Sequence, residues 1–238
     1  MIKFYPAFSG VFTDFFGLFF PKLCLACEGV LPAGEAHICL SCQLELPKTA
    51  LHLTANNIFT ERLAGRVRLH RGTAMFEFRA ESRVASLIHA IKYENKPDAA
   101  VEIGRWYGEN LKKTGDFDDV TAILPVPMFR KKEVMRGFNQ SERFAEGLSE
   151  TMGLRVDENI LKKVRMTESQ TKKNRTERLK NTEEVFTVAT KIKENPTPHF
   201  LIVDDVLTTG ATLESCATAL LKATPHLKIS MATIAIRV

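Results

Sequence analysis

The sequence predicts an α/β fold built on a parallel β-sheet, with a small cysteine-rich segment ahead of it. Strand-like and helix-like hydrophobic patterns alternate after residue 70, which is typical of a parallel sheet flanked by helices. Two closely spaced cysteine pairs lie before residue 45. The 238 residues, 45% hydrophobic and 26% charged, have a globular composition that excludes collagen-like and disordered chains. We place the domain boundary after residue 66, which gives an N-terminal domain of residues 1–66 and a sheet domain of residues 67–238.

The first twenty residues predict an amphipathic helix, because phenylalanines recur there at three- and four-residue steps. We expect its aromatic face to pack on the neighbouring small domain, and docking to a partner or a membrane surface is the alternative. No apolar run approaches the roughly 18 residues of a membrane-spanning helix, and no signal-peptide cleavage pattern is present, so we expect a cytoplasmic protein. The phenylalanines on this face are Phe4, Phe8, Phe12, Phe15, Phe16 and Phe19.

Four cysteines form two CxxC pairs with eleven residues between them, which predicts a zinc site. Each pair places two thiolates about one tetrahedral edge apart, and two pairs complete four-coordinate binding. Because the protein supplies all four ligands, we expect the zinc to be structural; reduced cysteines without metal and a redox-active pair are the alternatives. His37 is interpreted as a solvated loop residue and Cys216 as a small core residue. The expected ligands are Cys24, Cys27, Cys39 and Cys42.

Beyond residue 70 the pattern predicts strands and helices in alternation. The helices are inferred from apolar residues at positions i, i+3, i+4 and i+7, and the strands from short apolar or β-branched runs. One run, FLIVDDV, is nearly continuous, as expected of a strand covered on both faces of a parallel sheet. The expected strands are residues 73–78, 122–126, 200–206 and 228–236, and the expected helices are residues 84–91, 103–111, 140–152 and 211–222.

The most informative segment lies at the end of the expected strand 200–206. Asp204 and Asp205 come near its end as adjacent unpaired carboxylates, and a turn of threonines and glycine then leads into a helix. Ligands of parallel sheets bind at the carboxyl ends of the strands. The N–H groups, hydroxyls and helix dipole of such a turn suit a monophosphate, and the carboxylates can accept hydrogen bonds from sugar hydroxyls. Neither a Walker A nor a GxGxxG pattern is present, and a purely structural strand–turn–helix is the alternative.

The net charge of +5 is unevenly distributed along the chain. Residues 162–180 contain eight basic and two acidic residues, and residues 130–136 contain four basic and one acidic residue. Two basic segments in a chain that is otherwise close to neutral predict an anionic ligand, either a polyphosphate or a nucleic acid. For any single lysine among them, a solvated surface is the alternative interpretation.

The segment around Asp204 and Asp205 resembles the ribose-phosphate motif of type I phosphoribosyltransferases, in which four apolar residues and two acids precede a loop rich in threonine and glycine. From about residue 23 to residue 238 the chain resembles the ComF family of competence-associated proteins. Asn95-Lys96 departs from the Gly-Lys expected there. Besides the double CxxC, the motifs that carry the resemblance are Ile91-Lys92-Tyr93, Leu124-Pro125-Val126-Pro127, Arg136-Gly137-Phe138-Asn139-Gln140-Ser141, Ser169-Gln170, Arg178 with Asn181, and Phe186.

The resemblance implies a type I phosphoribosyltransferase-like sheet, a zinc ribbon, and a site for phosphoribosyl pyrophosphate (PRPP) with Mg²⁺. It implies that Asp204, Asp205 and Arg136 are catalytic. The implied PRPP-binding residues are Asp204, Asp205, Val206, Leu207, Thr208, Thr209, Gly210, Ala211 and Thr212. The implied pyrophosphate loop and mobile hood contribute Lys92, Tyr93, Val126, Pro127, Arg136, Asn139, Gln140, Gln170, Arg178 and Asn181.

The resemblance also implies a function in DNA uptake during natural competence, as a pentosyl-transferring enzyme whose acceptor the sequence does not name. The alternative is a non-catalytic accessory protein that binds or processes single-stranded DNA and uses the fold as a phosphate-binding scaffold. Residues 165–180 contain no aromatic side chain on which bases could stack, which argues against such a platform in that segment. The expected partners are PRPP or another phosphoribosyl ligand, single-stranded DNA, other competence proteins and a second copy of the chain.

Overall fold

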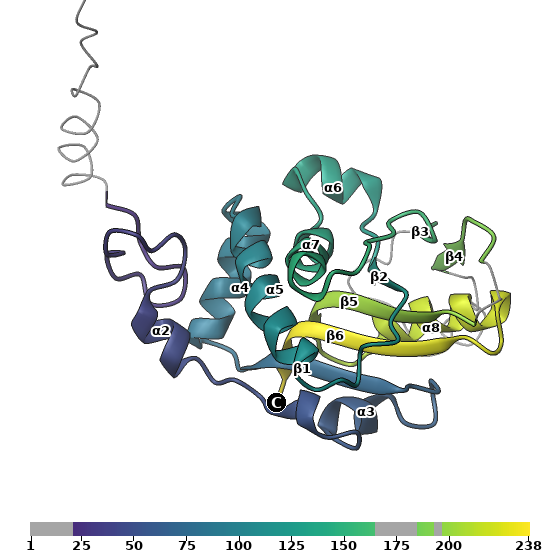
Figure 1. Cartoon of the computed structure of the whole chain (residues 1–238). Coiled ribbons are helices and arrows are strands. Elements are labelled where there is room, and N and C mark those ends of the chain that lie inside the picture. The colour runs from purple at the N-terminus through teal and green to yellow at the C-terminus, as the bar shows by residue number, and fades with distance from the viewer. Residues whose placement is uncertain (1–20, 165–184, 193–196) are drawn as a thin grey trace, which may run out of the picture.

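The computed structural model of the chain describes residues 21–164, 185–192 and 197–238. Its centre is a sheet of four parallel strands in the order β1-β6-β5-β2 (Figure 1). The predicted α/β fold is thereby confirmed. The phenylalanine-rich helix expected before residue 21 lies outside the described residues. The strands of this sheet are β1 (Arg71–Phe78), β2 (Ala122–Pro125), β5 (His199–Leu207) and β6 (Lys228–Arg237).

Helices cover both faces of the sheet (Figure 1). On one face α4, α5 and α7 pack with Leu201 and Val203 of β5, whereas on the other face α3 and α8 pack with Phe200. Because successive side chains of a strand point to opposite faces of the sheet, the side chains of Asp204 and Asp205 near the end of β5 leave the backbone on opposite faces. The helices are α3 (Ile58–Leu63), α4 (Arg83–Tyr93), α5 (Pro97–Lys112), α7 (Gln140–Met152) and α8 (Ala211–Ala223).

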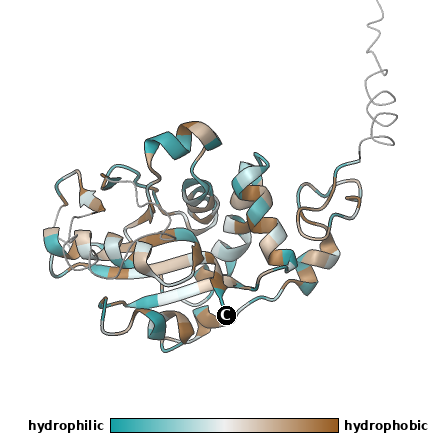
Figure 2. Ribbon diagram, turned by 180° about the vertical axis from the view of Figure 1, so that it is seen from behind, coloured by the Kyte–Doolittle hydropathy of each residue, from teal (hydrophilic) through white to brown (hydrophobic). Residues whose placement is uncertain are grey.

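The predicted elements agree with the structure within two residues, except that α5 begins six residues earlier than expected, and α7 has the predicted bounds. Six elements of three to seven residues were not predicted, because so few residues leave too little periodicity to recognise. No residue of α6 is buried, and Figure 2 shows hydrophilic and hydrophobic residues side by side in it. Within the described ranges, no helix is long and apolar enough to cross a membrane. The unpredicted elements are α2 (Leu40–Glu45), the 3₁₀ helix η1 (Leu51–Leu53), α3, α6 (Arg130–Arg136), β3 (Leu161–Lys163) and β4 (Phe186–Val188).

Glycines bring α5 and α7 into close contact. A Cβ atom added to Gly147 would lie 2.0 Å from the carbonyl oxygen of Val101, and one added to Gly104 would lie 2.4 Å from the carbonyl oxygen of Phe144. Both distances are far below ordinary van der Waals contact, so only glycine allows the two backbones to approach this closely. The contact fixes α7, whose N-terminus extends to the end of β5.

The cysteine-rich segment shares an apolar cluster with α4 and α5, and two ion pairs join it further to these helices. His37 Nδ1 lies 2.9 Å from Glu102 of α5, and Arg83 of α4 donates to Glu45 of α2 at 2.7 Å. His37 lies in a loop and outside the cysteine cluster, as interpreted, but it is half-buried and not fully solvated, because a carboxylate 65 positions further along the chain provides it with a partner. The domain boundary after residue 66 stays a prediction.

Candidate functional site

Two adjacent carboxylates near the carboxyl end of β5 form the centre of the site. Asp205 is only 7% exposed, and its Oδ2 accepts from Lys92 Nζ at 2.7 Å and from Gln140 Nε2 at 2.8 Å. Lys92 comes from the last turn of α4, and Gln140 is the first residue of α7. Three segments that are far apart in the sequence therefore meet at one carboxylate, and each of them carries a residue that the family resemblance had assigned to the site.

The Asp204 carboxylate is held separately from that of Asp205. Its Oδ1 accepts from Ser141 Oγ at 2.9 Å and from the backbone N–H of Asp205 at 2.9 Å. Burial, together with the neighbouring Asp205 charge, raises the pKa of Asp204 to about 7 although part of the side chain stays in contact with solvent. The sequence analysis treated the two acids as unpaired, and the structure corrects this because α4 and α7 supply partners for both.

Arg136 and Tyr93 extend the network outward from Gln140. Arg136 Nη1 donates to Gln140 Oε1 in a short hydrogen bond, and the guanidinium lies 5.3 Å from the centre of the Tyr93 ring. Gln140 thus bonds Asp205 through its amide nitrogen and Arg136 through its oxygen. Two-thirds of the Tyr93 side chain is exposed, so this residue forms the outer end of the network.

Asn139 fixes the N-terminus of α7 at the end of β2. Its Nδ2 donates to the carbonyl oxygen of Val126 at 3.0 Å, and its Oδ1 accepts from the N–H of Ser141 at 3.1 Å as the helix cap. Val126 in turn donates to Val203 at 2.9 Å, and Pro127 follows it beyond the strand. The positions of Gln140 and Ser141 at the two carboxylates therefore depend on Asn139.

The loop between β5 and α8 has the geometry of a phosphate cradle. Thr208, Thr209 and Thr212 are exposed, and the loop ends at Gly210, the cap of α8, with φ of +84°. A Cβ atom added to Gly210 would lie 2.7 Å from Leu63 Cδ2, so this position requires glycine for both backbone conformation and space. The N–H of Ala211 donates to Thr209 Oγ1 at 3.5 Å, and the next N–H groups in the first turn of α8 have no partner within the helix. They are available to an anion.

Two arginines that the sequence analysis missed stabilise this loop by donating hydrogen bonds to its backbone carbonyls. Arg62 Nη1 donates to the carbonyl oxygens of Thr208 at 2.9 Å and Arg237 at 2.7 Å. Arg66 Nη2 donates to the carbonyl oxygen of Thr209 at 3.0 Å, and its Nη1 pairs with Glu214 of α8 at 2.7 Å. Backbone carbonyls have no residue-type signature, so nothing in the sequence indicated these contacts.

The structure describes only part of the predicted hood. Gln170, Arg178 and Asn181 lie outside the described residues. The segment expected as a pyrophosphate loop after Val126 is not all loop, because the helix α6 occupies residues 130–136. The prediction for Cys216 is confirmed, since this residue is fully buried in α8.

The four cysteines of the N-terminal segment form a separate candidate metal site. Their sulfur atoms all lie within 4.8 Å of one another, and the Sγ atoms of Cys27 and Cys39 are 3.8 Å apart. A tetrahedral zinc ion with Zn–S bonds of about 2.3 Å has sulfur atoms about 3.8 Å apart, so the donor set fits zinc. The Cys39 amide donates to Cys24 Sγ at 3.3 Å, which favours the thiolate form of this ligand. Because the four sulfurs would fill the coordination sphere, a zinc ion bound there would be structural.

The chain has relatives of known name. No family model matches it. It is 32% identical over 113 residues to "Competence protein F" of Haemophilus influenzae, a match that covers 48% of the chain and 49% of that protein. It is 26% identical over 217 residues to "DNA utilization protein YhgH" of Escherichia coli, covering 85% of the chain and 92% of the relative. "Competence protein ComFC" of Bacillus subtilis is 24% identical over 215 residues, covering 90% and 83%. The names of these relatives agree with the resemblance inferred from the motifs, and they support the assignment of the chain to the ComF family.

Proposed function

We propose that the chain binds PRPP with Mg²⁺ at the carboxyl end of β5 and transfers its phosphoribosyl group. The observation that carries this proposal is the acid pair Asp204 and Asp205, which lies directly before a glycine-containing loop at the start of a helix. In this proposal the two carboxylates accept hydrogen bonds from the ribose hydroxyls. The N–H groups and hydroxyls of residues 208–212 bind the 5′-phosphate.

The positive groups of the site suit the pyrophosphate leaving group. Lys92 and Arg136 are joined through Asp205 and Gln140, so both cations lie on the same side of the acid pair. In the proposed transfer, the bond from the anomeric carbon to pyrophosphate breaks and pyrophosphate leaves with the electron pair. The acceptor forms a bond to the same carbon and loses a proton. Mg²⁺ bound to PRPP would neutralise charge on the leaving group, and the protein contributes mainly positioning and electrostatic stabilisation.

We propose that this activity serves DNA uptake. Three relatives support this step by their names, which refer to competence and to DNA utilization. The acceptor would then be a molecule made or consumed during DNA uptake. Binding of PRPP and transfer to an acceptor are separate parts of the proposal and need separate tests.

Calorimetric titration of PRPP with Mg²⁺ into the zinc-loaded full chain tests the binding step. We expect saturable heat that requires Mg²⁺, and a weaker response to ribose 5-phosphate because it lacks the pyrophosphate. Asp205→Asn should abolish binding, since it removes the charge that Lys92 and Gln140 hold in place. Asp118→Asn is the matched control, because Asp118 is exposed and lies outside the site. Unchanged binding by the Asp205 variant would refute the assignment of the ribose subsite.

A second function, binding of single-stranded DNA without catalysis, is favoured by the surface of α6. This helix carries four basic residues against Glu133, and it exposes Val134 and Met135. Phosphate contacts make DNA affinity fall with salt concentration. Replacing Lys131 and Lys132 with alanine should therefore flatten the salt dependence of oligonucleotide binding. An unchanged slope would exclude α6 from DNA binding, and PRPP binding in the same variant shows that the protein is folded.

A further inference from the structure

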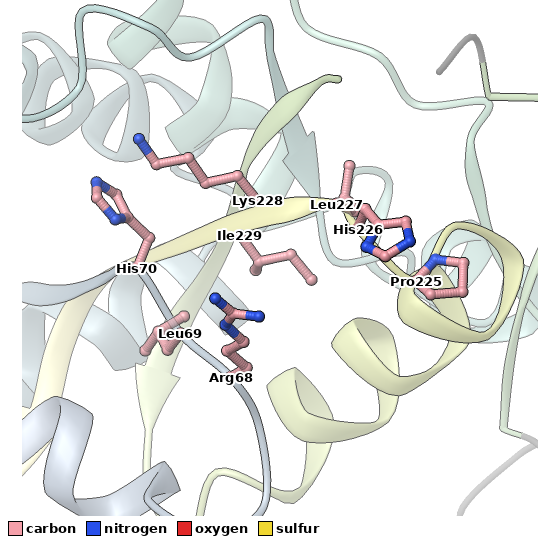
Figure 3. A pocket seen from close by; sticks show the side chains of 8 residues that line it. All are labelled: Arg68, Leu69, His70, Pro225, His226, Leu227, Lys228 and Ile229. Atoms are coloured by element: carbon pink, nitrogen blue, oxygen red, sulfur yellow. The ribbon is translucent and has the colours of Figure 1, made fainter. Parts of the chain in front are cut away.

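A polar hollow lies at the end of the sheet opposite the acid pair. Its volume is about 550 Å³, and it is formed where the chain enters β1 and β6 (Figure 3). Since all four strands are parallel, this edge and the carboxyl ends of the strands lie on opposite sides of the molecule. Half of the lining residues have basic side chains, and none has a carboxylate. The lining consists of Arg68, Leu69, His70, Pro225, His226, Leu227, Lys228 and Ile229.

Two of the basic groups are fixed by neighbouring side chains. Lys228 Nζ donates to Asp119 at 2.5 Å, and the ring of His70 lies edge-on against the ring of His199 at 5.2 Å. Burial and the positive charges of Lys228 and Arg71 lower the pKa of His70, so its ring is neutral at pH 7 and has one N–H to donate. No described residue forms a hydrogen bond with this ring.

The other two basic groups are available to a ligand. Arg68 and His226 are exposed, and within the described part of the chain neither side chain has a hydrogen bond or an ion pair. Figure 3 shows Lys228 and His70 on one side of β6 and Arg68 on the other, whereas His226 lies at the start of the strand. The positive groups are thus spread along the hollow and are not gathered at one point. The lining between them includes the apolar residues Leu69 and Ile229.

We propose that this hollow is a binding site for an anion with two neighbouring phosphate groups, distinct from the PRPP site. The planar guanidinium of Arg68 can donate two hydrogen bonds to one phosphate, and Lys228 with His70 supplies donors for the next. The four basic groups of the lining favour an anion over a metal cation, since Arg68 and Lys228 would repel a cation and no carboxylate or thiolate offsets their charge. The two phosphates belong either to a free polyphosphate or to adjacent phosphodiesters of a nucleic-acid strand.

The six histidines of the chain allow the site to be observed directly. We would titrate the ¹⁵N-labelled, zinc-loaded full chain with inorganic pyrophosphate and follow the imidazole signals by NMR. The rings of His70 and His226 should shift together along one saturable curve. Pyrophosphate bound at the acid pair would instead shift His89, whose ring lies 4.9 Å from that of Tyr93. Binding in the hollow and binding at the PRPP site therefore give separate signals, so either proposal can be refuted without the other.

Variants and a second probe complete the test. Arg68→Ala should weaken the binding followed by His70 and His226 at least about fivefold, since a charge-assisted contact is lost. Lys48→Ala, which removes one positive charge from an exposed position outside both sites, should leave it unchanged. A short oligothymidylate that shifts the same two rings assigns the site to nucleic acid, whereas a response to pyrophosphate alone assigns it to free polyphosphate. Absence of saturation with both probes, or equal affinity in the Arg68 variant, would overturn the proposal.

Discussion

Replacing Asp204 by asparagine should make the chain more stable at alkaline pH. Asparagine keeps the shape of the side chain and its oxygen, so it can still accept from Ser141 Oγ and from the N–H of Asp205. What it removes is a carboxyl group whose pKa is about 7 in the folded chain against 3.8 for an ordinary aspartate. The folded wild type therefore holds a proton that the unfolded chain releases, and the stability that this proton provides is lost as the pH rises toward 7.

The size of the effect follows from these two pKa values. Each unit of difference corresponds to about 1.4 kcal/mol, so linkage gives a loss of about 2 to 3 kcal/mol in wild-type stability between about pH 5 and pH 8. Because part of the Asp204 side chain reaches solvent, we expect a difference of about 2 kcal/mol. The free energy of unfolding of Asp204→Asn should rise relative to the wild type by this amount over that range.

Urea unfolding at several pH values measures this difference. Titrating groups at a distance from Asp204 are common to both proteins and cancel when the two curves are subtracted, so the difference reports Asp204 together with the groups it contacts. Asp118→Asn serves as the control, because an exposed carboxyl at a distance from the site should give a curve parallel to that of the wild type. If the curves of Asp204→Asn and the wild type are parallel between pH 5 and pH 8, the Asp204 carboxyl is not held in its protonated form and the reasoning fails.

Three further predictions concern the metal site and the phosphate loop. Atomic absorption should find one zinc ion per chain, and Cys42→Ser should lower both zinc content and melting temperature; an apo chain of equal stability would contradict a structural role. Gly210→Ala should lower the free energy of unfolding by about 2 to 4 kcal/mol, because the new Cβ atom is crowded and the backbone has a positive φ. Gly34 also has a positive φ, of +94°, but its Cβ position is open, so Gly34→Ala should lower the free energy of unfolding by only about 1 to 2 kcal/mol. Arg62→Met should lower stability by about 1 to 2 kcal/mol and weaken PRPP binding, measured by urea unfolding and calorimetry with Arg79→Met as a surface control; equal values for the two variants would show that Arg62 does not support the loop.

The parts of the fold that could be predicted are those whose residues repeat with a fixed period. The pattern of α7 gave both its ends, and the continuous run of β5 indicated a strand covered on both faces. In contrast, α6 has no buried residue, so nothing in its sequence marks one face from another. The pair β3 and β4 has three residues in each strand, which is too short for an alternating pattern to be recognised.

The site, too, has residues that could be predicted from the sequence and residues that could not. Family motifs brought Lys92, Arg136 and Gln140 into the prediction, and the structure joins them to Asp205. The contacts of Arg62 and Arg66 could not be predicted, because they depend on where the loop carbonyls lie after the chain has folded. Pairing of the acids was missed for a related reason, since the partners come from helices 63 and more positions away in the sequence.

The ion pair between Lys92 and Asp205 also decides what an approaching polyanion meets. Lys92 compensates the charge of Asp205, and Asp204 is partly protonated near neutral pH, so the acid pair has far less net charge than its two formal negative charges. A ligand rich in phosphate can then enter the unliganded site without strong repulsion. If the proposed PRPP site takes up a divalent cation with its ligand, that cation would compete with Lys92 for the Asp205 carboxylate. The freed ammonium group of Lys92 would then be within reach of the phosphates. The residue that neutralises Asp205 in the unliganded chain would thereby become a contact for the bound ligand.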